Sequence, residues 1–79
     1  MPITEQLRYA LDSVESAAGE VSLDFSSERR VDAAALRMME TLAGTAGGRG
    51  VKVVLHGVNI DIYKTLKLVK LAPRFSFEN

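Results

Sequence analysis

Two aspartates flank one predicted strand-to-helix turn, and their type and spacing could do chemistry. Asp24 lies at the end of a short alternating strand, and Asp32 lies just before a helical pattern. Open α/β sheets place their sites at the carboxyl ends of strands, so the pair could bind a cation or act as acid and base. A helix N-cap nevertheless accounts fully for Asp32, because its carboxylate can accept the N–H groups of the first turn. No third oxygen-rich side chain is predicted to converge on the pair.

The other candidates for chemistry are two serines and one histidine. Ser26 and Ser27 could be nucleophiles or phosphorylation targets, although serines in turns mostly serve local hydrogen bonding. His56 is the only histidine and the chain has no cysteine, so neither a common zinc site nor a Ser–His–acid set can be read from the spacing. We therefore predict no catalytic residue, no metal and no cofactor. A small enzyme or ligand binder that uses Asp24, Asp32 and His56 is kept as an alternative.

The residues after Asp32 suit contact with another protein better than they suit catalysis. Apolar residues recur at three- and four-residue steps and predict a helix with one buried stripe. The opposite side carries small or polar residues, with a methionine at the border. Small side chains permit close approach, and methionine adapts its shape to a partner. We predict that a partner protein docks on the following residues: Asp24, Asp32, Ala33, Ala34, Arg37, Met38 and Thr41.

The composition bounds the size and the environment of the protein. Ten basic residues balance ten acidic ones over 79 residues, so no net charge attracts nucleic acid or an anionic membrane. The absence of cysteine is compatible with a reducing cytoplasm. The N-terminal residues lack a basic or apolar leader pattern, and no apolar run is long enough to cross a bilayer. We predict one cytoplasmic domain over residues 1–79 that neither binds nucleic acid nor inserts into a membrane.

One charged feature stands out within this balance. Lys64, Lys67, Lys70 and Arg74 recur at three- and four-residue steps on or just after the third predicted helix. The simplest interpretation is a solvated face, and the functional alternative is a surface that binds an acidic partner.

Helices and strands alternate along the chain. Periodicity and breakers predict helices over 4–18, 33–46 and 60–71, strands over 21–25 and 51–55, and a short strand over 75–77. The predicted N-caps are Thr4, Asp32 and Asn59, and the predicted helix ends lie at Gly19, 47–50 and Pro73. This order predicts an α/β domain whose sheet of about three mainly parallel strands is joined by right-handed helical crossovers. A sheet this thin leaves an edge unpaired, which indicates a partner or a homodimer.

Two stretches carry a family pattern. After the strand at 21–25, Val31-Asp32, three small residues and Leu36 look like a strand, a "D-S/T-S/G-G-L" turn and a helix. Residues 53–59, followed by Leu66, Leu68 and Leu71, are similar to a strand-Gly-Val/Pro turn and an "L-x-L…L" helix. In order and spacing, residues 21–71 resemble the STAS domain. That family includes anti-sigma-factor antagonists, the tails of sulfate transporters and a small subunit of bacterial phospholipid-transport ABC systems.

The resemblance implies a non-enzymatic interaction module whose nearest analogue is the anti-sigma-factor antagonist, which binds a GHKL-type kinase. In switch-type antagonists a serine or threonine directly after the aspartate is phosphorylated, and that position here is Ala33. Binding is therefore expected to be constitutive. The alternative within the family is the STAS subunit of a lipid-transport ABC complex, with its ATPase as partner. The resemblance of Gly57-Val58-Asn59 and Tyr63 to that subgroup indicates this alternative.

The family also has a β-hairpin before its first helix, and this sequence shows no counterpart of it. We expect the sheet to have an open edge for that reason. We also expect the isolated protein to form a dimer or a larger assembly through this edge.

Overall fold

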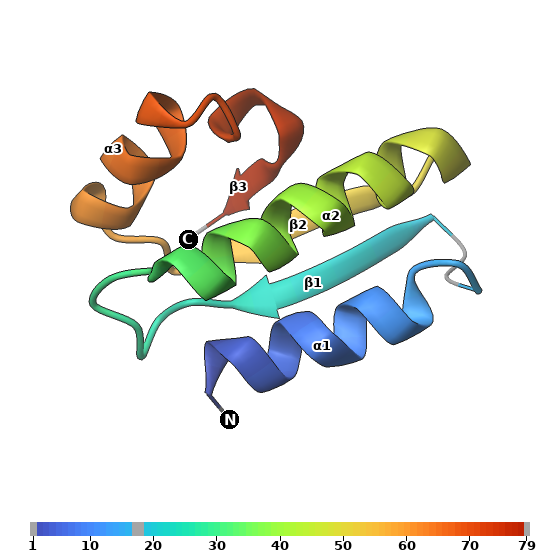
Figure 1. The fold of residues 1–79 in the computed structure, drawn as a ribbon, viewed down its shortest axis with the longest axis horizontal. Coiled ribbons are helices and arrows are strands. Elements are labelled where there is room, and N and C mark those ends of the chain that lie inside the picture. Colours follow the sequence, from blue (N-terminus) through green and yellow to red (C-terminus); the bar gives the residue numbers. More distant parts are fainter. Residues whose placement is uncertain (1, 17–18, 79) are drawn as a thin grey trace.

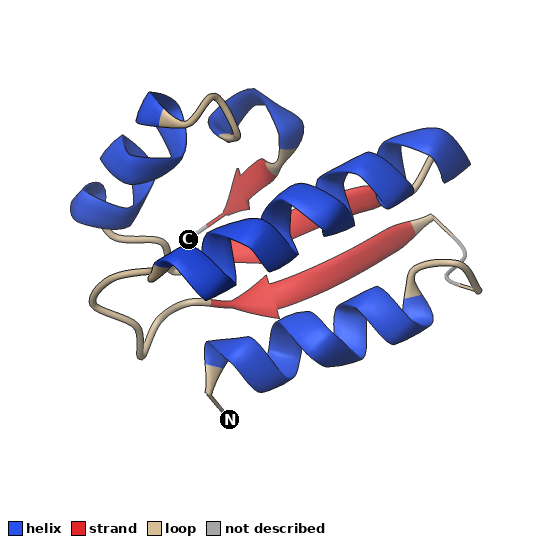
Figure 2. Cartoon of the chain, viewed as in Figure 1, coloured by secondary structure: helices blue, strands red, loops and turns tan. Residues whose placement is uncertain are grey.

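The chain folds into helices and strands that alternate from end to end (Figure 1). The computed structural model describes residues 2–16 and 19–78. In chain order the elements are α1 (Ile3–Ser13), β1 (Glu20–Asp24), α2 (Ala33–Arg49), β2 (Lys52–His56), α3 (Ile60–Leu68), the 3-10 helix η1 (Ala72–Arg74) and β3 (Ser76–Glu78). Figure 2 shows the same elements by type.

The three strands form one parallel sheet in the order β1-β2-β3. This confirms the predicted α/β class with about three parallel strands. Right-handed crossovers that advance in one direction place their helices on one face of the sheet, so α2 and α3 cover the same face. Helix α1 lies alongside β1 and α2 (Figure 1). The register pairs Leu23 with Leu55, and Leu55 with Phe77, on this covered face.

A single core fills the space between the helices and the sheet. Phe25, just after β1, is completely buried, as are Leu7 of α1, Met39 of α2 and Ile62 of α3. No polar or charged residue is buried among the residues that the structure describes. The opposite face of the sheet carries the alternating side chains, and at its carboxyl end Asp24, His56 and Glu78 are register partners in one row.

The first helix differs from its predicted bounds of 4–18. It begins after Pro2, whose fixed φ of −60° suits a helix start, and Thr4 lies inside the helix instead of capping it. It ends at Ser13, where the side-chain hydroxyl donates to the carbonyl of Tyr9 at 2.8 Å and competes with the helical hydrogen bonds. Gly19 therefore does not end this helix, and the predicted last residues, 17 and 18, lie outside the described part of the chain.

The other two helices also differ from their predicted bounds, although α2 does end within the predicted stop at 47–50. α2 continues through Gly47 and Gly48 and ends at Gly50, which adopts the left-handed conformation with φ 70°. α3 ends at Leu68, five residues before Pro73, because Lys70 turns into the left-handed region with φ 63°. Among residues 2–16 and 19–78, no helix combines the length and apolar character that crossing a membrane requires.

Candidate functional site

Asp32 sets the start of α2. Its carboxylate oxygen Oδ1 accepts a hydrogen bond from the backbone N–H of Ala35 at 2.8 Å, and its carbonyl accepts from the N–H of Leu36 at 3.0 Å. The predicted N-cap is therefore confirmed. A carboxylate at this end also meets the positive end of the helix dipole, so the first turn of α2 is held in place.

The loop before Asp32 is held by the turn that precedes α3. Asn59 caps α3 through Oδ1, which accepts from the N–H of Ile62 at 2.8 Å, as predicted. Its Nδ2 group also donates to the carbonyls of Glu28 and Arg29, each at 3.2 Å. One side chain therefore caps one helix and ties down the loop that leads to the other. This second role is not visible in the sequence, since the partners lie 30 or more residues apart and leave no local signal.

Gly57 lets the same two turns approach each other. Its φ is 70°, and a Cβ atom at this position would lie 2.8 Å from the Cβ and 3.0 Å from the Cα of Ser26. Only glycine fits such an approach without a shift of the backbone. Gly57, which the sequence marked only as a turn residue, and Asn59, which it marked as a helix N-cap, are thus what positions the β1–α2 loop.

Asp24 lies apart from Asp32. Its side chain is exposed on the uncovered face of the sheet, next to His56 in the register, whereas Asp32 lies at the start of a helix on the covered face. Hydrogen bonds from Ser26, first from its hydroxyl and then from its N–H, lower the pKa of Asp24, and His56 adds a smaller effect. The backbone N–H and carbonyl of Asp24 are taken by the side-chain amide of Gln6 at 2.8 and 3.0 Å. The structure therefore joins Asp24 to His56 and separates both from Asp32.

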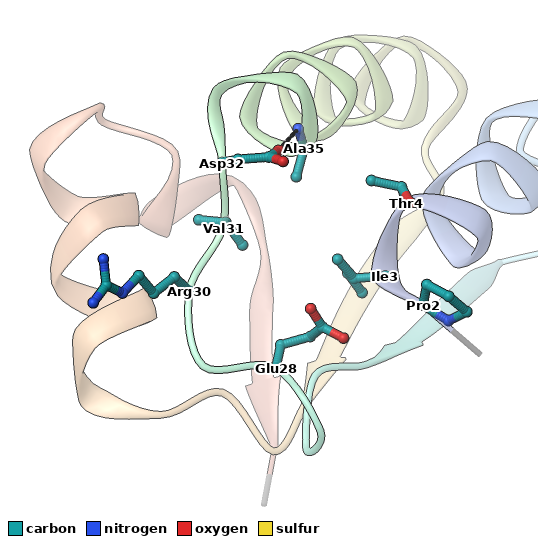
Figure 3. A pocket seen from close by; sticks show the side chains of 8 residues that line it. All are labelled: Pro2, Ile3, Thr4, Glu28, Arg30, Val31, Asp32 and Ala35. Atoms are coloured by element: carbon teal, nitrogen blue, oxygen red, sulfur yellow. Dashed lines mark hydrogen bonds between the residues drawn. The ribbon is translucent and has the colours of Figure 1, made fainter.

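A cavity of about 440 Å³ opens beside the start of α2 (Figure 3). Residues from α1, the loop and α2 line it: Pro2, Ile3, Thr4, Glu28, Arg30, Val31, Asp32 and Ala35. The Glu28 carboxylate points into this space, the Arg30 side chain points away from it, and the Asp32 carboxylate faces the N–H of Ala35. The first residues of α1 were not predicted to lie here, because only the packing of α1 against α2 puts them there.

The lining of this cavity offers little for catalysis. Its two carboxylates come without a histidine, a cysteine or a serine, and Asp32 is already occupied as a cap. Over residues 2–16 and 19–78, no group of three or more His, Cys, Asp and Glu side chains is placed to hold a metal ion.

The outer face of α2 carries most of the predicted docking residues. Ala33, Ala34, Arg37 and Thr41 are exposed, and Met38 is half-buried against the core. Ala35 does not belong to this face, since it is only 1% exposed and its side chain lies in the core. A helix rotates by about 100° per residue, so the third alanine of the run turns inward while the first two stay outside.

Two glycines extend the same face toward the end of α2. Gly44 and Gly48 are exposed, and a Cβ atom on either would meet nothing within 4 Å. The packing of this domain therefore does not require glycine at either position, although glycine inside a helix costs about 1 kcal/mol relative to alanine. Gly48 was predicted only as part of a helix stop. Together with Ala33, Ala34, Arg37 and Thr41, these glycines make a long exposed surface that consists mostly of small residues. We call it the smooth face of α2 (Ala33, Ala34, Arg37, Thr41, Gly44 and Gly48).

The sequence of this domain matches the model of a known protein family. The family model described as "Mlab, STAS domain" matches residues 1–73, which adds α1 to the part of the chain in which the sequence pattern was found. Neither the curated proteins nor the solved structures gave a match. Because the family model covers nearly the whole domain, from α1 to η1, this chain belongs to the STAS domain family.

Proposed function

We propose that this protein is a non-enzymatic interaction module, similar to an anti-sigma-factor antagonist, that docks a partner on the smooth face of α2. The observation that supports it most is the face itself, which is exposed along α2 and carries small residues that the fold does not need. STAS domains generally act as binding modules. Small side chains let a partner's backbone approach closely, while Arg37 and Met38 supply specific contacts. Asp24, which was predicted to belong to this surface, lies on the other face of the sheet and is left out of it.

Binding in this proposal is constitutive. Ala33 is exposed and directly follows the cap residue, which is the position of the phosphorylated hydroxyl in switch-type antagonists. Alanine has no group to phosphorylate. A phosphate at this place would lie at the N-terminus of a 17-residue helix, where free N–H groups and the dipole favour negative charge. Ala33→Ser should therefore restore a phosphorylation site for a cognate kinase without disturbing the fold.

The docking face is tested by titration against the purified candidate partner, a GHKL-type kinase from the same organism. Arg37→Glu and Ala34→Arg should each lower affinity about tenfold or more, because one reverses a contact charge and the other blocks close approach. Arg8→Glu is the matched control, since it reverses the charge of an exposed arginine on α1. Unchanged affinity in folded Arg37→Glu and Ala34→Arg proteins would exclude this face.

A second candidate function is the STAS subunit of a lipid-transport ABC complex. The resemblance of Gly57-Val58-Asn59 and Tyr63 to that subgroup supports it, and these residues include the two that position the β1–α2 loop. The partner would then be an ATPase. Parallel titration with the kinase and with a transporter ATPase separates the two functions. With either partner, the protein would act in the bacterial cytoplasm.

Self-association through a sheet edge is also proposed. The outer edge of β1 is blocked at Asp24 by Gln6, which leaves only Glu20 and Ser22 free to pair. In an antiparallel dimer centred on Ser22, Glu20 would face Asp24 of the other copy, and like charges oppose that pairing. A homodimer through a sheet edge would therefore use the outer edge of β3, and it would compete with any other chain that pairs there. Light scattering at high protein concentration tests this, and a strictly monomeric protein would rule it out.

A further inference from the structure

A groove lies between α3 and β3, separate from the smooth face of α2. These two elements are on the far side of the domain from α1 (Figure 1). Two cavities of about 240 and 470 Å³ form the groove, and Tyr63 and Phe77 line both. These two rings pack edge to face with their centroids 5.2 Å apart. Ile60, which lines the smaller cavity, is 71% exposed. The groove is thus an apolar, aromatic surface that is open to solvent.

The outer edge of β3 forms one side of this groove. The N–H of Gly57 donates to the carbonyl of Glu78 at 3.1 Å, so Ser76 and Glu78 direct their backbone groups toward β2. In a parallel ladder the residue between them directs its N–H and carbonyl the other way. Those groups of Phe77 therefore face outward, and no residue within the described ranges hydrogen-bonds them. By contrast, the corresponding groups of Asp24 on β1 are occupied by Gln6.

The two ends of the groove differ in charge. Lys67 and Lys70 line the larger cavity, with the Lys67 Nζ atom 6.0 Å from the centre of the Tyr63 ring. Neither lysine makes an ion pair within residues 2–16 and 19–78. Arg74 is directed elsewhere, since its guanidinium donates to the carbonyl of Ala43 on α2. The smaller cavity ends instead at Glu78. One end of the groove is therefore basic and uncompensated.

Lys70 supplies a second, independent observation. It has φ 63° and is the only described residue other than glycine with a positive φ. Its place, just after the end of α3, is one where helices usually carry glycine or asparagine, because a lysine side chain makes this conformation strained. The left-handed turn itself ends α3, with the N–H of Leu71 donating to the carbonyl of Leu66 and the N–H of Lys70 to that of Lys67. What bears on the groove is that this position carries a lysine, and that the lysine lines the larger cavity.

We propose that this groove binds an extended segment of a partner protein, which pairs with the edge of β3 and presents acidic side chains to Lys67 and Lys70. An apolar side chain of the segment would fill the smaller cavity between Ile60 and Tyr63. Backbone pairing supplies affinity in this mode of recognition, and the flanking pockets supply specificity. The free backbone groups of Phe77 favour a polypeptide over a membrane surface, which would use the lysines and not the edge.

The test uses nuclear magnetic resonance titration with a blocked peptide of sequence Glu-Glu-Val-Ile-Val, and Lys-Lys-Val-Ile-Val as its matched control. The acidic peptide should shift the amide signals of α3 and β3 and slow the exchange of the Phe77 N–H, and the basic peptide should do neither. Equal binding of both peptides, shifts that map to α2, or unchanged exchange at Phe77 would each overturn the proposal. Anionic lipid vesicles that bind with the same lysine dependence, while the acidic peptide does not bind, would assign the groove to a membrane.

Three variants sharpen the experiment. Lys67→Glu with Lys70→Glu should weaken the acidic peptide about tenfold, since two exposed attractions become repulsions. Lys70→Gly should weaken it as well while keeping or raising the midpoint of thermal unfolding, because it removes the strain together with the charge. That combination cannot come from unfolding. Lys52→Glu, on the uncovered face of the sheet, is the control, and Arg37→Glu on α2 should leave peptide binding unchanged.

Discussion

The two strand-to-helix turns of this domain are built differently. The turn from β1 to α2 spans residues 25–32 and is a long loop, whereas the turn from β2 to α3 spans only residues 57–59. Each ends in a side chain that caps the next helix at 2.8 Å, Asp32 in the first and Asn59 in the second. Only Asn59 reaches further, to the backbone of the other turn.

This difference shows which turn depends on the other. An amide side chain has an acceptor and a donor, so Asn59 can cap α3 and still bind two carbonyls, whereas a carboxylate can only accept. The short turn therefore acts as a brace for the long one. The loop that leads to the smooth face of α2 is held in part by residues some 30 positions later in the chain.

The largest expected effect comes from Gly57→Ala. The added Cβ atom would collide with Ser26, and an alanine at this position would have to adopt a φ of 70°. We therefore expect the free energy of unfolding to fall by about 2 to 4 kcal/mol. Urea denaturation measures it. Gly48→Ala is the matched control: it meets nothing within 4 Å and should stabilise α2 by up to about 1 kcal/mol. A Gly57→Ala protein as stable as wild type would show that the two turns are not locked together.

An intermediate effect is expected at Asn59. Asn59→Ala loses the cap and both bonds to the long turn, and should cost about 2 kcal/mol. Asn59→Asp keeps the acceptor for Ile62 but places a carboxylate against the carbonyls of Glu28 and Arg29, so it tests the brace alone. It should speed hydrogen exchange in residues 26–31 while α3 remains protected. Loss of protection in α3 itself would mean that the cap, and not the brace, is what Asn59 contributes.

The smallest expected effect is at Asp32. Asp32→Ala should cost about 1 kcal/mol, because the N–H of Ala35 loses its acceptor, and Asp32→Asn should cost little, since asparagine caps equally well. Thermal unfolding of the two variants separates the cap from the charge. If Asp32→Asn were as damaging as Asp32→Ala, the negative charge of the carboxylate at the start of α2 would be the important feature. Asp32 would then stabilise its helix through charge, whereas Asn59 does so through hydrogen bonds alone.

The parts of the fold that local pattern could predict are those decided within a few residues. The α/β class followed from alternating periodicities, and the caps at Asp32 and Asn59 followed from side chains that bind N–H groups three positions on. Helix ends were less predictable. α1 ends at Ser13 and not at Gly19, and the end of α3 depends on a lysine in a conformation that its residue type does not favour.

In the candidate site, too, some features follow from the sequence and others only from the packing of the elements. By itself the sequence determined that Ala33 has no hydroxyl, that Ala34, Arg37 and Thr41 share an outer face, and that no thiol chemistry exists, because residue type and helical rotation suffice for these. Only the tertiary structure decided that Asp24 lies beside His56 and away from Asp32, and that Asn59 braces the long turn. It alone also created the groove between α3 and β3. Contacts between distant segments depend on how the elements pack, and no local pattern of residues encodes that.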